Sequence, residues 1–506
     1  MAERAAEPND RREGVTSLPR EGAGSKGRRL ARNTLFSAVS ESSFFLLALL
    51  FLLLPRALGP VPFGEYSAAA AFVGLFRILP DFGMSYASTI AISRDRSLAE
   101  RWAGNLLGFQ SLLSLLTVAL CLGIGRFLFE GVTFQAIAIL TVSLVLSSYK
   151  VTLRWLLKSF DRFGAEAFSL VLERTLLLAL GVLSLKAGWG MLGFVLVFAV
   201  LRIPDTLGLW AWVTARVVPL RLRGERELWG ELFWKGLPFA YAGAMILLFF
   251  QMDQVLLRLL RGAEEVGWYG APVKVLEGLT LVPRILAYAF IPTMASLHAA
   301  SPAEVAGLYR RGSKYLLLVG LPIAAFGYLA SDVFIPLLFG PQYLKSVSAA
   351  QILLPSCAFM FLSNFGETTL ACIDRWKTIV LVSTGSVLLN LVLNLLWIPR
   401  YGFLGASWAT LWTEAAYFVL TAVSLRILGQ RIGWASLAAR PALAAAVFAL
   451  VLWGIRRVLG GHSPVVALCG ASAAASAVWL AATFALGVWD RAERDLLRRP
   501  APRNGS

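Results

Sequence analysis

Long apolar segments recur along most of the chain, separated by short polar stretches. Each is about 20 residues long, the length that a helix needs to cross the hydrocarbon of a bilayer. Strands of a membrane barrel would alternate apolar and polar residues over about ten positions, whereas the segment Phe44–Leu54 is continuously apolar. Because backbone polar groups in lipid must be satisfied internally, the pattern predicts an all-α, polytopic membrane protein.

We expect about fourteen transmembrane helices from this pattern. The first six are predicted near 34–55, 64–90, 104–125, 133–156, 166–186 and 190–214. Six more are predicted near 235–259, 267–297, 313–339, 347–371, 377–398 and 403–425. The last two are predicted near 439–457 and 464–488. Residues 1–30 are polar and lack apolar periodicity, so we interpret them as a disordered cytoplasmic tail.

The two halves of the chain resemble each other. The first half carries Leu58-Gly59-Pro60, Gly64-Glu65-Tyr66 and Pro80. Shifted by about 203 positions, the second half carries Gly262, Gly267-Trp268-Tyr269 and Pro283. A second match, Gly190-Met-Leu-Gly193 with Gly402-Phe-Leu-Gly405, pairs Arg202 with Glu414. Each unit holds six predicted spans, so the units are parallel repeats, and transporters built this way hold substrate between their halves.

The repeat divides the chain into two pseudo-symmetric six-helix lobes and a helix pair. We predict a cytoplasmic tail at 1–30, an N-terminal lobe at 31–230, a C-terminal lobe at 231–430, a C-terminal helix pair at 431–490, and a second cytoplasmic tail at 491–506. Transporters with paired lobes alternate access by rocking the lobes against each other. The paired lobes therefore favour a transporter, and a membrane enzyme is the less suitable interpretation.

Charge refines this topology. Of 506 residues, 58% are hydrophobic and 15% charged, with a formal net charge of +17. The basic residues lie mostly between apolar segments, which argues for contact with membrane lipids and against nucleic acid. About 32 Lys and Arg fall on the side of the N-terminus and about 9 on the other, so the positive-inside rule places both termini in the cytoplasm. We expect a multi-pass protein of the cytoplasmic membrane.

The remaining composition excludes several kinds of chemistry. The four cysteines show no CxxC spacing, and there are only two histidines. The cysteines are better explained as small buried apolar side chains than as metal ligands or disulfides. With so few histidines, a zinc site or histidine-based catalysis does not suit this chain. We therefore expect no metal, no cofactor and no catalytic residues.

A charged side chain at mid-bilayer costs at least about 2.5–3.5 kcal/mol, so each one needs a reason. Six basic candidates for a substrate site lie in predicted helices: Arg77, Lys150, Arg174, Arg202, Lys274 and Arg284. Three of them have an acid three or four positions on, which permits a self-neutralised pair on one helix face. These pairs are Arg77 with Asp81, Arg202 with Asp205, and Lys274 with Glu277.

The other basic candidates have different surroundings. Glu173 and Arg174 are adjacent, so their side chains diverge and each needs a partner elsewhere. Arg284 follows Pro283, whose kink suits either a hinge at a cavity or passive packing. Lys150 begins a stripe with Arg154 and Lys158 at spacings of four. Snorkelling to lipid headgroups explains the stripe better than an entry patch for an anionic substrate.

Polar and acidic candidates for coupling or for a polar cavity are Glu41, Glu173, Asp253, Glu414 and Asn390. Glu41 lies within a polar patch of an otherwise apolar helix, which should face the bundle interior. It either holds another helix by hydrogen bonds or binds hydroxyl groups of a substrate or a coupling cation. Asn390 and Asn394, one turn apart, have the same two interpretations.

Several segments resemble polysaccharide biosynthesis flippases. They are Leu58-Gly-Pro with Phe63-Gly-Glu-Tyr66 and Asp81-Phe-Gly83, Lys235-Gly-Leu-Pro238 with Asp253 and Val266-Gly-Trp-Tyr269, Phe339-Gly-Pro-Gln-Tyr343, and Tyr401-Gly-Phe-Leu-Gly-Ala406. The resemblance covers residues from about 30 to about 430 and implies the multidrug/oligosaccharidyl-lipid/polysaccharide exporter superfamily. It implies a V of two six-helix lobes that moves a polyprenyl-pyrophosphate-linked oligosaccharide from the cytoplasmic to the outer leaflet.

These observations leave three candidate functions. The embedded cations favour a flippase for lipid-linked oligosaccharide. A cation-coupled multidrug exporter of the same fold would favour carboxylates in the cavity, and acids are present too. A membrane-embedded polysaccharide polymerase or ligase would need a larger extramembrane loop with catalytic residues. We expect a non-enzyme that acts as a monomer and is coupled to H⁺, Na⁺ or another energy source.

Overall fold

The computed structural model describes residues 42–298, 302–459 and 463–490, together with residues 32, 33, 35, 36, 39, 40 and 493. The predicted tail at 1–30 therefore lies outside the described residues. So do Glu41 and, apart from Glu493, the predicted tail at 491–506.

The described residues fold almost entirely into helices. Those of the first repeat are α2 (Phe44–Leu58), α3 (Pro60–Leu75), α4 (Met84–Arg94), η1 (Arg96–Leu98), α5 (Ala99–Leu128), α6 (Gly131–Ser159), α7 (Phe163–Lys186) and α8 (Gly190–Arg216). Those of the second are α9 (Arg226–Arg261), α10 (Ala263–Leu279), α11 (Leu281–His298), α12 (Pro302–Phe339), η2 (Pro341–Tyr343), α13 (Ser346–Leu353), η3 (Leu354–Ser356), α14 (Cys357–Cys372), α15 (Trp376–Tyr401) and α16 (Phe403–Ile427). The last pair is α17 (Trp434–Val458) and α18 (Pro464–Ala485).

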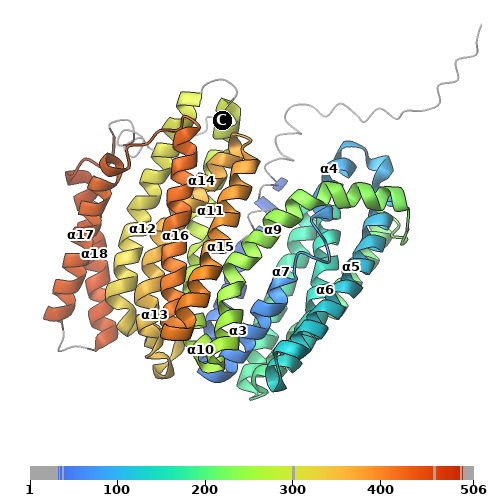
Figure 1. The fold of residues 1–506 in the computed structure, drawn as a ribbon, viewed down its shortest axis with the longest axis horizontal. Coiled ribbons are helices and arrows are strands. Elements are labelled where there is room, and N and C mark those ends of the chain that lie inside the picture. Colours follow the sequence, from blue (N-terminus) through green and yellow to red (C-terminus); the bar gives the residue numbers. More distant parts are fainter. Residues whose placement is uncertain are drawn as a thin grey trace, which may run out of the picture.

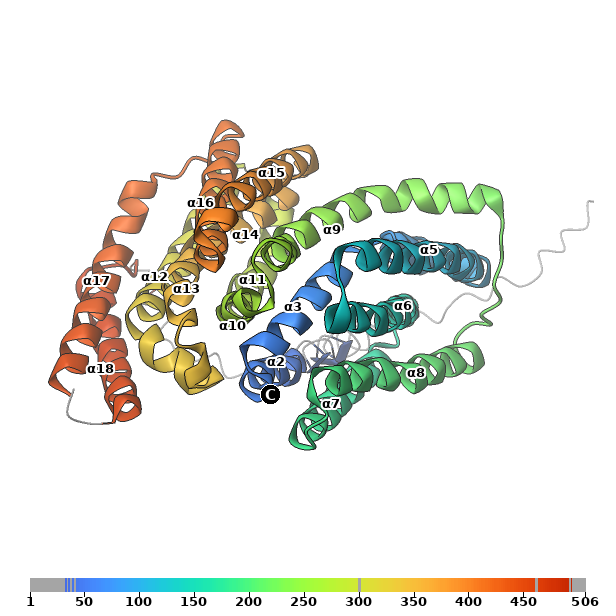
Figure 2. The same cartoon turned by 60° about the horizontal axis from the view of Figure 1, so that its bottom comes forward.

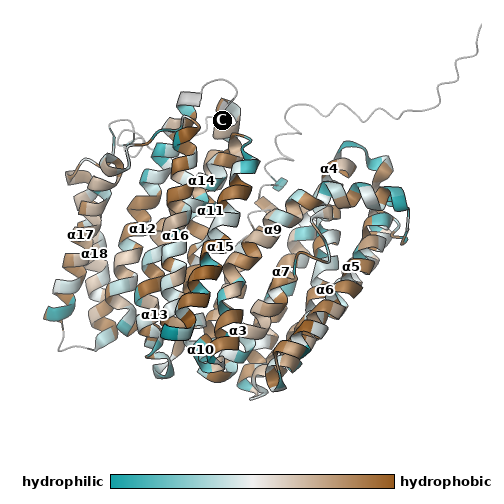
Figure 3. Cartoon of the chain, viewed as in Figure 1, coloured by the Kyte–Doolittle hydropathy of each residue, from teal (hydrophilic) through white to brown (hydrophobic). Residues whose placement is uncertain are grey.

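The all-α membrane fold is confirmed. Within the described residues, eleven segments are long and apolar enough to cross a membrane. The shorter apolar helix α2, the broken pair α3–α4 and helix α16 bring the bundle to the fourteen spans predicted from the sequence. Figure 3 shows apolar residues along the helix shafts and hydrophilic residues gathered toward their ends, as a bilayer requires.

The helices form two lobes and an outlying pair (Figures 1 and 2). Helices α5 to α8 lie in one lobe, α12 to α16 lie in the other, and α17 and α18 pack against α12 at the far edge. The long helix α9 packs both on α3 of the first lobe and on α15 of the second. The residue limits 31–230, 231–430 and 431–490 of the three parts stay predictions.

Three predicted helices are broken in the structure. The second predicted helix divides into α3 and α4 around a turn that holds Pro80 and a positive φ of 48° at Phe82. The eighth divides at Thr280, just before Pro283, and the tenth at η3, which holds Pro355. Proline lacks the N–H that a continuous helix needs, so the breaks have a local cause. The first two occur at equivalent positions of the repeat.

The lobes meet where α3 crosses α10. A Cβ on Gly64 would overlap the carbonyl oxygen of Ala263, and a Cβ on Gly267 would overlap that of Pro60. The two contacts are related by the sequence repeat, because the shift that separates Gly64 from Gly267 also separates Pro60 from Ala263. Only glycine permits such a close approach of two helix backbones. We call the end of the molecule that contains this contact the crossing end.

The turns that lead into α3 and α10 are also related by the repeat. Gly59 and Gly262, which precede these helices, have φ values of 79° and 96°. Such positive values favour glycine because it lacks a Cβ. The chain can therefore reverse in a single residue, and this brings Gly64 and Gly267 to the same depth.

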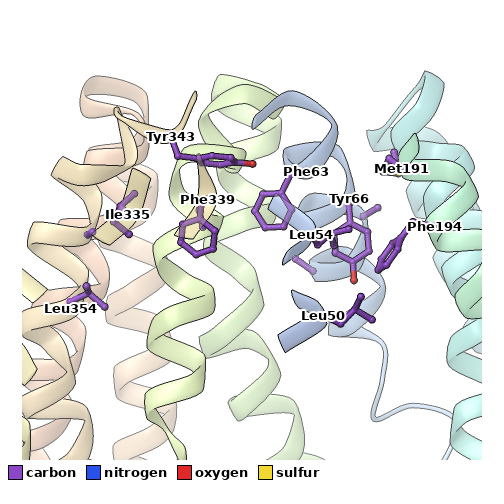
Figure 4. Packing of buried hydrophobic residues seen from close by; sticks show 14 of the residues in the cluster. Leu50, Leu54, Phe63, Tyr66, Met191, Phe194, Ile335, Phe339, Tyr343 and Leu354 are labelled. Carbon is purple, nitrogen blue, oxygen red and sulfur yellow. The ribbon is translucent and has the colours of Figure 1, made fainter. Parts of the chain in front are cut away.

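Aromatic packing closes the crossing end between the lobes (Figure 4). Phe63 and Tyr66 of α3 pack toward Phe194 on one side and Tyr343 on the other. Hydrogen bonds reinforce this layer, since the Tyr343 hydroxyl donates to the carbonyl of Pro55 at 3.0 Å.

Polar contacts join the lobes beside this aromatic layer. Arg56 Nη1 donates to the carbonyl of Leu337 at 2.9 Å. Arg258 forms an ion pair with Glu65 at 3.3 Å. At this end of the molecule, the two lobes are therefore in contact both through backbone and through side chains.

The opposite end, which we call the tail end, holds the end of α18. There Lys314 of α12 contacts Glu493 at 2.7 Å and the carbonyl of Val488 at 3.3 Å. Tyr315 donates to Glu493 at 2.6 Å. These contacts fasten the C-terminal helix pair to the second lobe.

The glycine crossing leads to a stability prediction. Gly64→Ala and Gly267→Ala should each destabilise the protein by about 1–3 kcal/mol, because the added methyl groups meet backbone that cannot move aside. Thermal unfolding in detergent, followed by loss of monodisperse protein, measures the effect. Gly123→Ala, on α5 with no atom near its Cβ position, is the matched control. Equal stability of Gly64→Ala and the control would contradict a tight crossing.

Candidate functional site

A cavity of about 660 Å³ lies between the two lobes. Its lining comes from α2, α3, α6 and α8 of the first repeat and from α9, α10, α11, α14, α15 and α16 of the second. Tyr66 and Gln254 lie toward the crossing end, while Glu367 and Ser383 lie toward the tail end. The aromatic layer therefore closes the cavity on one side of the membrane.

Four of the six basic candidates line this cavity: Arg77, Arg202, Lys274 and Arg284. Within the described part of the chain, the guanidinium groups of Arg77 and Arg284 form no ion pair and no hydrogen bond. Both side chains are exposed to the cavity. An ionised group in a membrane interior without a partner is costly, so these two arginines are available for an anionic ligand.

The predicted pairing of Arg77 with Asp81 is wrong. The helix breaks between them, and Asp81 instead accepts hydrogen bonds from the Ser85 backbone N–H and hydroxyl. Spacings of four place two residues on one face only when the helix is continuous.

Lys274 and Glu277 form the predicted ion pair at 2.9 Å. The Lys274 ammonium also lies 5.7 Å from the centre of the Phe51 ring. Lys274 therefore brings to the cavity a charge that Glu277 already partly neutralises, in contrast to Arg77 and Arg284.

Beside the cavity, the first lobe holds a buried charge network on α6, α7 and α8. Lys150, which is only 1% exposed, contacts Glu173 at 2.5 Å and Asp205 at 2.6 Å. Arg154 contacts Glu173 Oε2 at 2.7 Å, and Arg202 lies 3.7 Å from Glu173 Oε1, the oxygen that Lys150 contacts. Three cations thus share two carboxylates, and the surplus positive charge faces the cavity through Arg202.

This network corrects two interpretations from the sequence. Arg202 does not pair with Asp205, because Lys150 from α6 occupies that carboxylate. The stripe of Lys150, Arg154 and Lys158 does not snorkel to headgroups either. Each of its members contacts an acid on α7, with Lys158 lying 3.6 Å from Glu166. Lys150 is not among the residues that line the cavity.

Arg174 points away from its neighbour Glu173, as predicted. Its guanidinium donates to the Ser40 carbonyl at 2.9 Å and to the Ser43 hydroxyl at 2.7 Å. These contacts hold the start of α2 against α7 and lie outside the cavity lining. A substrate-binding role for Lys150 and Arg174 stays a prediction.

Asp253 is the centre of a second buried network, in the second lobe. It accepts hydrogen bonds from the Tyr269 hydroxyl at 2.8 Å, from the Thr410 hydroxyl at 2.8 Å and from the Asn394 amide at 2.7 Å. Asn394 also contacts Asn390 at 3.0 Å. The network joins α9, α10, α15 and α16, and neither Asp253 nor Asn390 lines the cavity. A coupling role for these two residues stays a prediction.

Glu414 lines the cavity, and Glu367 of α14 lies in the same wall. Glu414 accepts a hydrogen bond from Ser363 at 3.3 Å, and Glu367 accepts one from Tyr417 at 2.7 Å. Glu414 is the repeat counterpart of Arg202, so one pseudo-symmetric position carries opposite charges in the two lobes. Glu41 lies outside the described residues.

The sequence analysis did not single out the amides that line the cavity. Gln251 and Gln254 of α9 and Asn364 of α14 all contribute to its wall. A signal for the first two was present, because Gln251-Met-Asp253-Gln254 is a polar group inside an apolar helix. Of this group, the sequence analysis selected only Asp253, the one that faces away from the cavity.

Comparison with known sequences decides the family. The profile of the family described as polysaccharide biosynthesis protein matches residues 30–298, more than half of the chain. The chain belongs to the polysaccharide biosynthesis protein family. A protein of Shigella flexneri named for O-antigen transport is 25% identical over 163 residues, which span 31% of this chain and 38% of that protein.

A second relative is an uncharacterised membrane protein of Methanocaldococcus jannaschii. It is 30% identical over 106 residues, which span 21% of this chain and 20% of that protein. The chain thus matches well under half the length of both curated relatives.

Solved structures share the fold of this family member. A lipid II flippase, MurJ, in an inward closed conformation aligns with a TM-score of 0.73 at 12% identity, covering 92% of this chain and all of that one. A multidrug resistance transporter of the MOP superfamily in an inward-facing conformation aligns with a TM-score of 0.58 at 12% identity, covering 79% of this chain and 99% of that one. The predicted family and fold are thereby confirmed.

The buried network of the first lobe generates a second prediction. Glu173→Gln should destabilise this polysaccharide biosynthesis protein by about 3–5 kcal/mol, because it leaves three cations facing one carboxylate. Thermal unfolding in detergent checks it. The matched control is Glu231→Gln, which removes the exposed partner of Lys235 and should change stability little. A Glu173→Gln protein as stable as the control would contradict the network.

Proposed function

We propose that this protein is a flippase for polyprenyl-pyrophosphate-linked oligosaccharide. The observation that carries the proposal is that Arg77 and Arg284, which have no partner among the described residues, line a cavity between two pseudo-symmetric lobes. A pyrophosphate diester carries two negative charges, and guanidinium groups bind phosphate oxygens in bidentate fashion. Family membership and the relative named for O-antigen transport support the same cargo.

The rest of the cavity suits the other parts of such a cargo. Amide and hydroxyl groups of Gln251, Gln254, Asn364 and Ser383 line the wall beyond the arginines. These groups donate and accept hydrogen bonds, as sugar hydroxyls do. The polyprenyl tail is apolar and gains nothing from a polar cavity, so it remains in the bilayer beside the lobes.

We propose that the lobes alternate access by rocking about the cavity. In the structure the lobes are joined at the crossing end by Gly64, Gly267 and Tyr343. Opening that end requires these contacts to part. The breaks between α3 and α4 and between α10 and α11 offer matching places for the two lobes to bend.

The basic residues at the tail end support an orientation with both termini in the cytoplasm of the cytoplasmic membrane. In that orientation the cavity lies toward the cytoplasmic leaflet, where the cargo is made available. We propose Asp253 and Asn390 as the coupling site for H⁺ or Na⁺, and a monomer as the working unit.

The alternatives explain the cavity less well. An exporter of drugs has no need for two unpaired arginines, although Glu367 and Glu414 would suit a cationic compound. A polymerase or ligase needs catalytic groups outside the membrane. Among the described connections between helices, the longest is 217–225, which is too short to form a domain.

A reconstitution experiment tests the flippase. Purified protein in liposomes with a polyprenyl-pyrophosphate disaccharide should move the sugar between leaflets, as measured by an external glycosidase. Arg77→Ala and Arg284→Ala should each slow the movement at least about tenfold, because a hydrogen bond to a charged group contributes about 1.5–3 kcal/mol. Arg77→Lys and Arg284→Lys should retain more of the rate, since the charge remains.

The matched control is Arg375→Ala, which removes an exposed arginine between α14 and α15, outside the cavity. It should move the disaccharide at the wild-type rate. Absence of protein-dependent movement would refute the flippase. If the glycan were extended or transferred to an acceptor instead, the protein would be an enzyme.

A further inference from the structure

Charge is unevenly distributed around the cavity. Arg77 and Arg284, for which the described part of the chain offers no partner, come from the two broken helices, α3–α4 and α10–α11, and Arg202 comes from α8. The wall formed by α14 and α16 carries no basic residue in the cavity lining. It carries Glu367 and Glu414 instead, and we call it the acidic wall.

The two carboxylates of the acidic wall have unused hydrogen-bonding capacity. A carboxylate can accept about four hydrogen bonds. Glu414 accepts one, from Ser363, and Glu367 accepts one, from Tyr417. Neither forms an ion pair within the described residues.

Other buried acids of the described chain are better satisfied. Glu173 and Glu277 contact cations. Asp253 accepts from three side chains, and Asp81 accepts from the backbone N–H and hydroxyl of Ser85. Glu367 and Glu414 therefore differ in kind, because they have few protein partners and face a cavity. A structural role in helix packing does not account for that placement.

The chemistry next to these carboxylates suits a sugar. Asn364 contributes a half-buried amide to the same wall. The ring of Tyr417 lies 6.0 Å from that of Phe249, and both line the cavity. Carboxylates and amides satisfy the hydroxyl groups of a pyranose, while aromatic faces cover its apolar C–H surface.

We propose that the acidic wall holds the glycan and selects sugars without carboxylate groups over uronic acids. This inference rests on the proposed flippase function. Hydroxyl or ammonium groups of a neutral or amino sugar donate to Glu367 and Glu414. The carboxylate of a uronic acid has no hydrogen to donate to these oxygens, and the acidic wall offers it no basic residue in the cavity lining.

The arginines do not cancel this selection. They lie on other helices and are engaged by the pyrophosphate, which every such substrate carries. The two ends of the cargo are therefore recognised separately, the pyrophosphate by cations and the first sugars by the carboxyl groups of the acidic wall. Charge opposition across one cavity also orients the cargo, because reversing it would place phosphate against carboxylate.

Three synthetic substrates test this proposal. They share a polyprenyl pyrophosphate and a first sugar, and differ in the second sugar, which is glucose, glucosamine with a free amine, or glucuronic acid. Initial rates of movement between leaflets are measured in liposomes that contain the full-length protein. The wild type should move the glucuronic acid substrate at least about tenfold more slowly than the glucose one, since its carboxylate cannot donate a hydrogen bond to the acidic wall.

Glu367→Gln and Glu414→Gln, alone and together, keep side-chain size and replace a carboxyl oxygen by an amide NH₂ group, which can donate to the carboxylate of a uronic acid. Each should raise the ratio of the glucuronic acid rate to the glucose rate, with the double variant bringing it within about twofold of one. The matched control is Glu304→Gln, an exposed carboxylate at the start of α12, which should leave the ratio unchanged.

The outcomes separate this inference from the proposed function. Equal rates for all three substrates in the wild type would overturn the selection while leaving the flippase intact. Loss of movement for all three in the Gln variants, with intact folding, would also overturn it and would make the carboxylates part of the transport cycle itself. Absence of movement in the wild type would overturn both proposals.

Discussion

The close contact of α3 with α10 is the constraint on which the other features of this protein depend. Two backbones meet there because Gly64 and Gly267 lack side chains, and each glycine faces the carbonyl at the equivalent position of the other repeat. The contact fixes a pseudo-twofold axis between the lobes. Aromatic side chains around Tyr343 then close the same end. A polar cavity can exist beyond that point because the lobes are held together at one end and separate toward the other.

The cost of charge in hydrocarbon determines what that cavity contains. In the first lobe, Lys150 and Glu173 lie in a network of three cations and two carboxylates beside the cavity. Arg77 and Arg284 instead have no partner among the described residues, and both line the cavity. The same position of the repeat carries Arg202 in one lobe and Glu414 in the other. The two lobes therefore differ electrostatically at an equivalent position of the repeat.

The sequence predicted the architecture well, because apolar segments of membrane length and the repeat of Gly64 at Gly267 are local signals. It predicted ion pairs poorly where they depend on packing. Arg202 should have paired with Asp205 on one helix face, but Lys150 from a neighbouring helix takes that acid. No spacing rule reveals which helices are neighbours. The basic residues of the cavity could be selected from the sequence, because the free-energy cost of a charged side chain in hydrocarbon is known without a structure. Gln254 was missed because an amide in hydrocarbon costs less than a charge.

The most direct test of the account is to locate the pyrophosphate. A cryo-electron microscopy map of the protein with a bound polyprenyl-pyrophosphate oligosaccharide would show where its two phosphates lie. The account predicts phosphate density between the lobes, in contact with Arg77 and Arg284, with the prenyl chain leaving toward the bilayer. Density for the phosphates outside the cavity, such as on the outer face of α17 and α18, would contradict it.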